Sequence, residues 1–386
     1  MKTFCFISAA VFTLLARPVK SQLPSYDSIV KNEKVVPLQI GFVPPLSSNG
    51  RKNAEIYNHV SINALAGQSK GVLGTELSGI YSENFGHMMG FKGTGVVDVV
   101  HGSADGFQAA GVMAAIGGNT EGMQAGGVLA INDGNFNGFQ AGGILANTGR
   151  SLNGMQAGGV FAYTGDSMSG FQAAGVISIC KGRVDGMQAA GLVSIARTLR
   201  GLQVGLVNIT DSIEDGAVTI GLVNIVRKGG IMQAGVMNTE FSNAALFLRS
   251  GTPRFYGYVG AGTHFTGGDF RFSTLIGAGT TIKLAGKVSF NPEWMQWMIA
   301  PNGNFVYNNQ SNHVQQLRAV FSVNLYKLSI SAGPTVNLAY SGYLSSSGER
   351  GLDLAPQYFY NKNSNGGNTN VRGWWGYTAT VSFSIR

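Results

Sequence analysis

The chain has 386 residues, of which 57 are glycine, and only 12% of its residues are charged. A composition this rich in glycine and this poor in charge is unlike that of a cytosolic enzyme, and the length exceeds that of one ordinary domain. The net charge of +8 is modest, and Lys and Arg stand singly at turns, as at Arg150, Lys181 and Arg227, so nucleic-acid binding is not expected.

The first 21 residues have the pattern of a secretory signal peptide. Lys2 lies in a short basic start, an apolar stretch runs from Phe4 to Leu15, and the small Ser21 precedes a plausible cleavage point. The apolar stretch is shorter than the ~20 residues that a membrane-spanning helix needs, so membrane insertion would have to use strands. Cleavage removes Cys5 and leaves Cys180, which we interpret as a small apolar repeat residue.

Residues 22–70 carry two stretches of β-forming residues, at about 36–44 and 56–66, separated by a polar loop at 45–55. We predict that they are the first two strands of a barrel whose remaining strands follow near the C-terminus.

A repeat of 16 residues dominates positions 71–240. The clearest copies are GFQAAG at 106–111, GMQAGG at 122–127, GFQAGG at 138–143, GMQAGG at 154–159, GFQAAG at 170–175 and GMQAAG at 186–191. Glu76 and Lys92 occupy the Gln position upstream, and Gln203, Thr219 and Gln233 occupy it downstream. Each unit alternates β-forming residues and ends in a polar turn, such as 117–121, which favours two short strands per unit.

A parallel β-solenoid explains the invariant glutamine best. Equivalent residues of such a fold stack ~4.8 Å apart, so glutamines can bond amide to amide while Ala and Gly fill a narrow interior. The predicted structural ladder consists of Gln108, Gln124, Gln140, Gln156, Gln172 and Gln188.

The alternative is one large up-and-down β-barrel. The residue before each glutamine alternates strictly between Phe and Met, and the resulting 32-residue period could mark pairs of strands. Against this, the strands offer Ala and Gly where lipid favours larger side chains. This column consists of Phe107, Met123, Phe139, Met155, Phe171 and Met187; we expect it to serve core packing, with an exposed contact surface as the other interpretation.

The C-terminal part, 250–386, has longer strands with two-residue alternation. We predict strands at about 254–265, 270–284, 286–291, 315–325, 327–340 and 374–385, with tight turns near 285–286 and 326–327 and long polar loops at 292–313 and 341–373. In the last strand an apolar face alternates with small polar residues, as lipid-facing barrel strands require. Its predicted membrane-facing residues are Trp375, Tyr377, Val381, Phe383 and Ile385.

Six strands here and two before the repeats make eight, the smallest usual membrane barrel. The predicted fold is therefore all-β: a parallel β-solenoid of 16-residue repeats joined to an antiparallel membrane-type barrel of about eight strands, with the repeats inserted after the second strand. With a periplasmic N-terminus, strand parity places the repeats on the periplasmic side or in the lumen, and one miscounted strand would place them outside.

The units GLQVGLVNI at 201–209 and IMQAGVMN at 231–238 resemble those of surface-repeat proteins of Gram-negative bacteria, as does the segment from Gln39 to Leu46. The resemblance covers about 35–240 and implies a location in the cell envelope. It brings no catalytic residues. The chain departs from the pattern by having Ala or Ser where Asn is expected in most units.

The sequence shows no catalytic, cofactor-binding or metal-binding motif. Its histidines, His59, His87, His101, His264 and His313, are not at metal-ligand spacing. Asp105, Glu121, Asp133 and Asp166 are interpreted as a row of solvated turn residues. A polysaccharide-acting solenoid enzyme would need an asymmetric cluster of carboxylates, which near-identical units do not offer.

We therefore predict a non-enzymatic outer-membrane or cell-surface repeat protein with a structural or adhesion-like binding role. Its expected partners are outer-membrane lipid and an envelope protein or polysaccharide. The alternative is a small pore or a ligand-binding barrel, although eight strands leave an interior largely filled by side chains.

Overall fold

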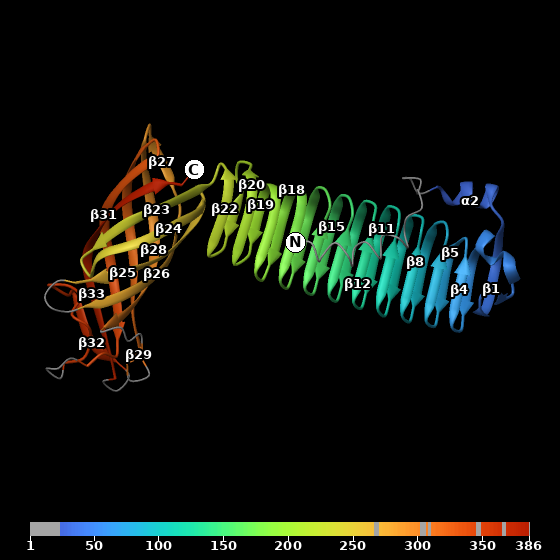
Figure 1. The fold of residues 1–386 in the computed structure, drawn as a ribbon, viewed down its shortest axis with the longest axis horizontal. Coiled ribbons are helices and arrows are strands. Elements are labelled where there is room, and N and C mark those ends of the chain that lie inside the picture. Colours follow the sequence, from blue (N-terminus) through green and yellow to red (C-terminus); the bar gives the residue numbers. More distant parts are fainter. Residues whose placement is uncertain are drawn as a thin grey trace. The chain divides into compact units, whose positions relative to one another are not determined.

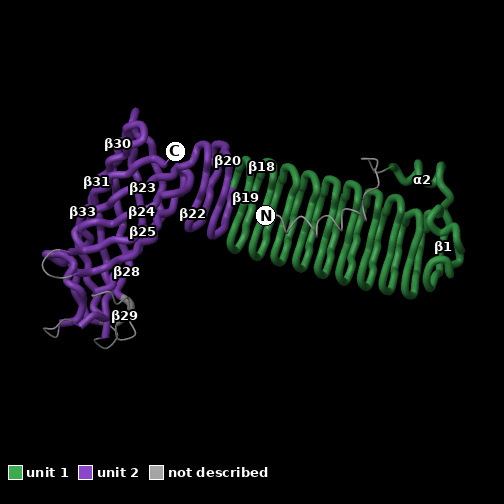
Figure 2. The backbone as a smooth tube through the Cα atoms, in the orientation of Figure 1, with its two compact units in different colours: residues 1–201 green, residues 202–386 purple. Residues whose placement is uncertain are grey.

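The computed structural model describes residues 24–265, 270–301, 306–307, 310–344, 349–364 and 368–385. The predicted signal peptide, 1–21, lies outside these residues. The chain divides into two compact units, Met1–Gly201 and Leu202–Arg386 (Figure 2). The predicted fold class is confirmed: the protein is all-β, with a parallel β-solenoid of about 11 turns and a closed antiparallel barrel of eight strands (Figure 1).

Each full turn of the solenoid contains one long and one short strand. The long strands are β3 (Tyr57–Asn63), β5 (Gly71–Ser78), β7 (Met88–Thr94), β9 (Ala104–Ala110), β11 (Thr120–Gly126), β13 (Phe136–Gly142), β15 (Leu152–Gly158) and β17 (Met168–Ala174). The short strands are β4 (Ala66–Ser69), β6 (Tyr81–Asn84), β8 (Val97–Val100), β10 (Met113–Ile116), β12 (Leu129–Asn132), β14 (Leu145–Thr148) and β16 (Phe161–Thr164). In β18 (Ile177–Ala190) and β19 (Val193–Val204) a short strand continues into the next long one.

Neighbouring turns pair in parallel with a register of one repeat, so that Gln124 lies beside both Gln108 and Gln140. From β7 to β19, one glycine of each long strand makes this close stacking feasible. Gly138 has a φ of 134°, and a Cβ added there would lie 1.9 Å from the carbonyl oxygen of Gly122. Only glycine adopts this backbone conformation readily, which explains the glycine two positions before each glutamine.

The N-terminal end of the solenoid is covered by its own first segment. Helix α2 (Tyr26–Asn32) places Ile29 against Tyr57 and Leu73, and strand β1 (Val35–Val43) pairs in parallel with β3 and antiparallel with β2 (Leu46–Ser47). The short 3-10 helix η1 spans Gly50–Glu55. No helix in the described part of the chain is long and apolar enough to cross a membrane.

This arrangement corrects the assignment of 22–70. The stretches predicted as barrel strands at 36–44 and 56–66 are β1 and β3, which belong to the solenoid sheet, and β3 pairs in parallel with β5. The two-residue alternation of a strand is the same in a parallel solenoid and in an antiparallel barrel, so it does not reveal the partner. The repeat array is therefore not inserted into the barrel.

The second unit begins with the last solenoid strands, β20 (Val207–Ile213), β21 (Val218–Ile220) and β22 (Val223–Lys228). The Asn208 side chain donates to Asn224 Oδ1 at 2.7 Å, so asparagine stacks here. Within the same unit, the backbone N–H of Asn224 donates to Ser250 Oγ of the barrel at 3.0 Å.

The barrel is formed by one continuous part of the chain. Its strands are β23 (Ile231–Thr239), β24 (Ser242–Thr252), β25 (Phe255–His264), β26 (Arg271–Gly279), β28 (Val288–Pro301), β30 (Gln310–Leu325), β31 (Leu328–Ser341) and β33 (Thr369–Ser384). Pairing of β28 with β30 and of β23 with β33 closes the ring. Short strands β27 (Ile282–Ala285), β29 (Val306–Tyr307) and β32 (Tyr360–Ser364) flank it.

Several predicted boundaries in this part were wrong. Strands β23 and β24 lie in or just after the predicted repeat array, because IMQAGVMN at 231–238 resembles a repeat unit. Most of the predicted loop 292–313 lies in β28 and β30, and β33 begins within the predicted loop 341–373. The turns at 285–286 and 326–327 are present, since Ala285 pairs with Val288 and Leu325 with Leu328.

Candidate functional site

The six predicted ladder glutamines form one buried column inside the solenoid. Gln140 shows the pattern: its Nε2 donates to Gln124 Oε1 at 2.8 Å and to the Asn147 carbonyl at 2.9 Å. Its Oε1 accepts from Gln156 Nε2 at 2.7 Å and from the Thr148 hydroxyl at 3.0 Å. The hydrogen-bonding groups of this buried amide are therefore satisfied, and the same amide–amide hydrogen bond recurs from Gln108 to Gln188.

Charged side chains replace glutamine at the start of this column. Glu76 and Lys92 are fully buried there, and Lys92 Nζ forms an ion pair with Asp98 Oδ1 at 2.7 Å. Burial raises the pKa of the Asp98 carboxyl, Lys92 opposes that rise, and Glu76 adds to it. The sequence placed Glu76 and Lys92 at this position but did not indicate Asp98, which stands where the next turn has Ala114.

A second polar group lies around Glu83. His101 Nε2 lies 2.8 Å from Glu83 Oε1, and this hydrogen bond lowers the pKa of the glutamate. Burial, together with the nearby Glu83, raises the pKa of Tyr81 to about 12. His101 therefore has a carboxylate partner. Among the described residues, no three His, Cys, Asp or Glu side chains gather as metal ligands would.

The prediction that the acidic turn residues Asp105, Glu121, Asp133 and Asp166 form one row was wrong. Asp105 and Glu121 do occupy equivalent positions in β9 and β11. Asp133 and Asp166 lie elsewhere in their turns, beyond the short strands β12 and β16. They do not stack with the first two because their spacing in the sequence is not a multiple of the repeat.

The Phe and Met column points away from the solenoid interior. Met123 and Met155 are 45% and 48% exposed, whereas the neighbouring glutamines are buried. Successive strand residues point to opposite faces, so an inward Gln requires its neighbour to point outward. Core packing was therefore the wrong interpretation of this column.

The five residues predicted to face the membrane all point outward from β33 and its C-terminal end. Their exposed fractions run from 44% for Val381 to 72% for Trp375, while the intervening Thr378, Thr380 and Ser382 are buried. Strands β23, β24, β26, β28, β30 and β31 also carry exposed apolar residues. Exposed apolar residues on them include Val236, Leu246, Ile276, Trp294, Met298, Leu317, Phe321, Val323 and Ile330.

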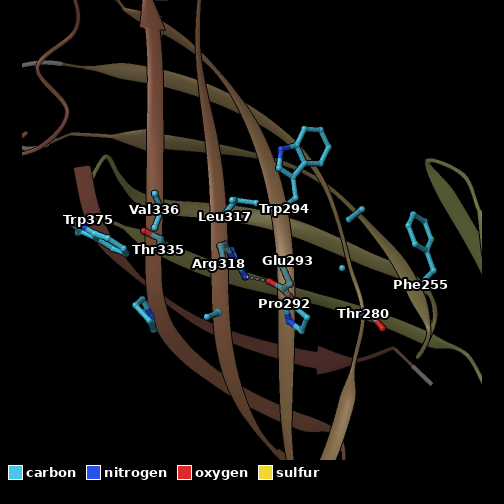
Figure 3. A pocket seen from close by; sticks show the side chains of 14 residues that line it. Phe255, Thr280, Pro292, Glu293, Trp294, Leu317, Arg318, Thr335, Val336 and Trp375 are labelled. Atoms are coloured by element: carbon cyan, nitrogen blue, oxygen red, sulfur yellow. Dashed lines mark hydrogen bonds and ion pairs between the residues drawn. The ribbon is translucent and has the colours of Figure 1, made fainter. Parts of the chain in front are cut away.

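The barrel interior holds a buried ion pair at mid-height. Arg318 Nη2 lies 2.5 Å from Glu293 Oε2, and both side chains are almost fully buried (Figure 3). Glu293 Oε1 accepts hydrogen bonds from the hydroxyls of Tyr256 and Tyr258 at 2.9 and 2.8 Å. The Arg249 guanidinium lies 3.7 Å from the centre of the Tyr256 ring. These contacts satisfy the buried carboxylate, as a charge in a low-dielectric interior requires.

Toward the end of the barrel with the long connections, aromatic residues fill the interior. Trp297 and Trp374 are fully buried and pack edge-on against Phe241. The Trp374 Nε1–H donates to Glu240 Oε1 at 2.6 Å. Leu352 and Leu354, from the segment between β31 and β33, belong to the same buried cluster. The described side chains therefore fill the interior over much of its length.

A shallow apolar groove marks the outer wall of the barrel (Figure 3). Pro292, Ala319 and Pro334 form its floor, because Pro292 pairs with Ala319 on β30 and Pro334 follows on β31. One wall consists of the larger Trp294, Leu317, Val336 and Trp375. Short side chains in one outward row beside bulky ones in the next produce the depression.

The barrel's ion pair was not predicted from the sequence, because the predicted loop 292–313 includes Glu293. The sequence does contain a signal for this pair. Glu293 and Arg318 stand next to apolar residues in strands with two-residue alternation, so each occupies an inward position.

Compared with known proteins, the chain matches no family model, no curated protein and no solved structure.

Proposed function

We propose that this chain is a non-enzymatic protein of the bacterial outer membrane, with the barrel embedded in lipid and the solenoid serving as a structural or binding arm. The observation that carries the proposal is the distribution of residues in the barrel. Outward positions on its strands are mostly apolar, and the interior contains Glu293, Arg318, Arg249 and many hydroxyl groups. This is the reverse of a water-soluble β-protein and is typical of transmembrane barrels.

Energetics favour lipid around this wall. Removing apolar surface from water contributes about 25 cal/mol per Å², so water around these exposed side chains would be costly. Patches beyond a few hundred Å² are rare on soluble monomers. The resemblance of the repeats to Gram-negative surface-repeat proteins supports the same location.

The filled interior favours an anchor over the alternative of a pore or ligand-binding barrel. Trp297, Trp374 and Phe241 occupy one part of it, and the Glu293–Arg318 pair occupies another. An eight-stranded barrel has room for little more than its own side chains.

Barrel topology also suggests which side the solenoid occupies. The chain enters β23 at the end of the barrel that carries the tight turns 253–254 and 326–327 and the end of β33. The long connection 342–368 lies at the opposite end. Because bacterial barrels have short periplasmic turns and longer external loops, the chain preceding Ile231 starts from the periplasmic side. An envelope protein or polysaccharide met there is the partner class we propose.

Membrane insertion can be tested with the variant Leu317→Arg. Arginine at a lipid-facing position near the bilayer centre costs about 2–4 kcal/mol, so less protein should reach the outer membrane in a folded, heat-modifiable form. Asn153→Arg, on the exposed solenoid surface, is the matched control and should fractionate like the natural chain. Natural protein that stays soluble without detergent would refute the proposal.

Sidedness requires a separate measurement. A protease site placed in the turn at Asn119 should resist protease added to intact cells and be cut once the outer membrane is permeabilised. Cleavage on intact cells would place the repeats outside and favour an adhesive role.

A further inference from the structure

One face of the solenoid has an apolar surface that the proposed barrel anchor does not explain. On the long strands, the outward Phe and Met column is followed two residues later by a column of small residues, mostly Ala. At the next bend comes a column of Val, Ile and Leu. Met155, Ile144 and Leu192 are 48%, 50% and 49% exposed. We call these three columns the Phe/Met face.

The Phe/Met face is repeated on consecutive turns. Its first column consists of Phe91, Phe107, Met123, Phe139, Met155, Phe171 and Met187; its last consists of Ile80, Val96, Val112, Val128, Ile144, Val160, Val176 and Leu192. Parallel pairing in register keeps each column straight, as for Phe139 beside both Met123 and Met155. The result is a continuous apolar strip parallel to the solenoid axis.

The size of this strip matches what a protein dimer requires. Eight turns at ~4.8 Å and six residues at ~3.3 Å give about 38 Å by 20 Å, or about 760 Å². Stable interfaces bury about 800 Å² per partner, with an apolar centre and a polar rim. A polar column borders the strip here, containing Glu121, Asn137, Asn153 and Ser169.

The alternation of Phe and Met makes the strip complementary to itself. Six alternating positions run from Phe107 to Met187. A two-fold axis that lies in the interface, perpendicular to the solenoid axis and passing between Phe139 and Met155, reverses their order in a second copy. Every Phe of these six positions then faces a Met: Phe107 faces Met187, Phe139 faces Met155, and Phe171 faces Met123 of the second copy. Flexible Met packs well against aromatic rings, and a closed two-fold dimer needs this self-complementarity.

We propose that the Phe/Met face binds the same face of a second copy of this chain, in antiparallel orientation about that axis. The alternation of Phe and Met then has a physical role. With an even number of alternating positions the two-fold axis sets each Phe opposite a Met, whereas an odd number would set Phe opposite Phe and Met opposite Met. The dimer does not depend on where the barrel is located.

Cysteine cross-linking tests the predicted register in the full-length chain. In a Cys180→Ser background, Phe171→Cys and Met123→Cys are placed in two differently tagged copies and co-expressed. A short thiol-to-thiol linker that spans the ~10 Å between packed sheets should join the two tags. Phe171→Cys alone should not cross-link, because its two copies lie three turns, about 14 Å, apart along the axis. Equal cross-linking of the single and mixed pairs would overturn the register.

Compensating substitutions test the Phe–Met pairing itself. Met155→Phe alone puts Phe opposite Phe at the centre and should lower the cross-linking yield several-fold. Phe139→Met combined with Met155→Phe again places Met opposite Phe at the centre and should recover the yield, and protease resistance of each variant checks that the solenoid is folded. Equal yields for both variants would refute the pairing. Labelling of the Phe/Met face by a bilayer-confined reagent, without any mixed cross-link, would show that lipid covers it and would overturn the dimer.

Discussion

The solenoid and the barrel both bury polar groups inside a closed β-structure, but they satisfy them differently. In the solenoid the same hydrogen bond between glutamine side chains recurs on successive turns, from Gln108 to Gln188. In the barrel, Glu293 is satisfied by three different side chains from two other strands. Repetition provides a partner one repeat away in sequence, whereas the barrel needs groups brought together over long separations. An interior built by repetition should therefore be sensitive to any break in its column.

The largest effect is expected from breaking the glutamine ladder at its centre. Gln140→Ala leaves two or more buried groups without partners, at ~1–3 kcal/mol each, and opens a cavity, so we expect a loss of at least about 4 kcal/mol. Thermal unfolding of the solenoid, followed by circular dichroism, measures it. Asn153→Ala, at an exposed position of the neighbouring strand β15, should change stability by less than about 0.5 kcal/mol. Similar effects of both substitutions would contradict a structural role for the ladder.

The stability of the solenoid should depend on whether the charged group of Glu76, Lys92 and Asp98 is left intact or removed as a whole. Asp98→Ala leaves Lys92 buried without its ion pair and should destabilise the solenoid by about 3–5 kcal/mol. The triple variant Glu76→Gln, Lys92→Gln and Asp98→Ala rebuilds the pattern of the later turns and should be at least as stable as the natural chain. A triple variant less stable than Asp98→Ala alone would show that the charges are required.

The barrel's ion pair should show a comparable dependence. Glu293→Gln keeps the shape but leaves Arg318 without its counter-charge, so we expect a loss of about 3 kcal/mol. The temperature at which the folded band disappears on unheated gels measures this loss. Ser382→Ala, an inward hydroxyl of β33, serves as the control, and an unchanged transition in Glu293→Gln would argue against the pair's importance.

Stability of the solenoid should also depend on pH through Asp98. Its pKa in the folded chain lies above the ordinary value of 3.8, so the folded state binds this proton more tightly than the unfolded state does. The contribution is fully present below the ordinary pKa and is lost as the pH rises through the raised one. The natural chain should therefore lose stability relative to the triple variant as the pH rises above 3.8. A stability difference independent of pH would contradict this.

The smallest effect is expected at Cys180. It points inward and pairs with Thr164, the equivalent residue of the preceding turn. Burial raises the pKa of this thiol to about 11, and its Sγ donates to the Asp166 carbonyl at 3.1 Å. Alkylation at neutral pH should be roughly two orders of magnitude slower in the folded chain than after unfolding, because little thiolate is present. Cys180→Thr should change stability by less than about 1 kcal/mol. Rapid alkylation of folded protein would show that the site is accessible.

The sequence by itself determined the solenoid turns and their glutamine column. A strict spacing of 16 residues places equivalent side chains in line once strands stack in register, and a long amide at each position has a partner on both neighbouring turns. It also determined the outward face of β33, because alternation of Trp375, Tyr377 and Val381 with small polar residues separates two environments whatever the strand pairs with.

Only the tertiary structure decided which strands pair. Alternation is identical in β1, which joins the solenoid, and in β23, which opens the barrel, so local pattern could not distinguish them. The partners of Glu293 were hidden for the same reason: Tyr256 and Arg318 lie on other strands, 37 and 25 residues away in sequence. Pairing over such separations is decided by the closing of the whole barrel, because no local preference selects one strand as the neighbour of another.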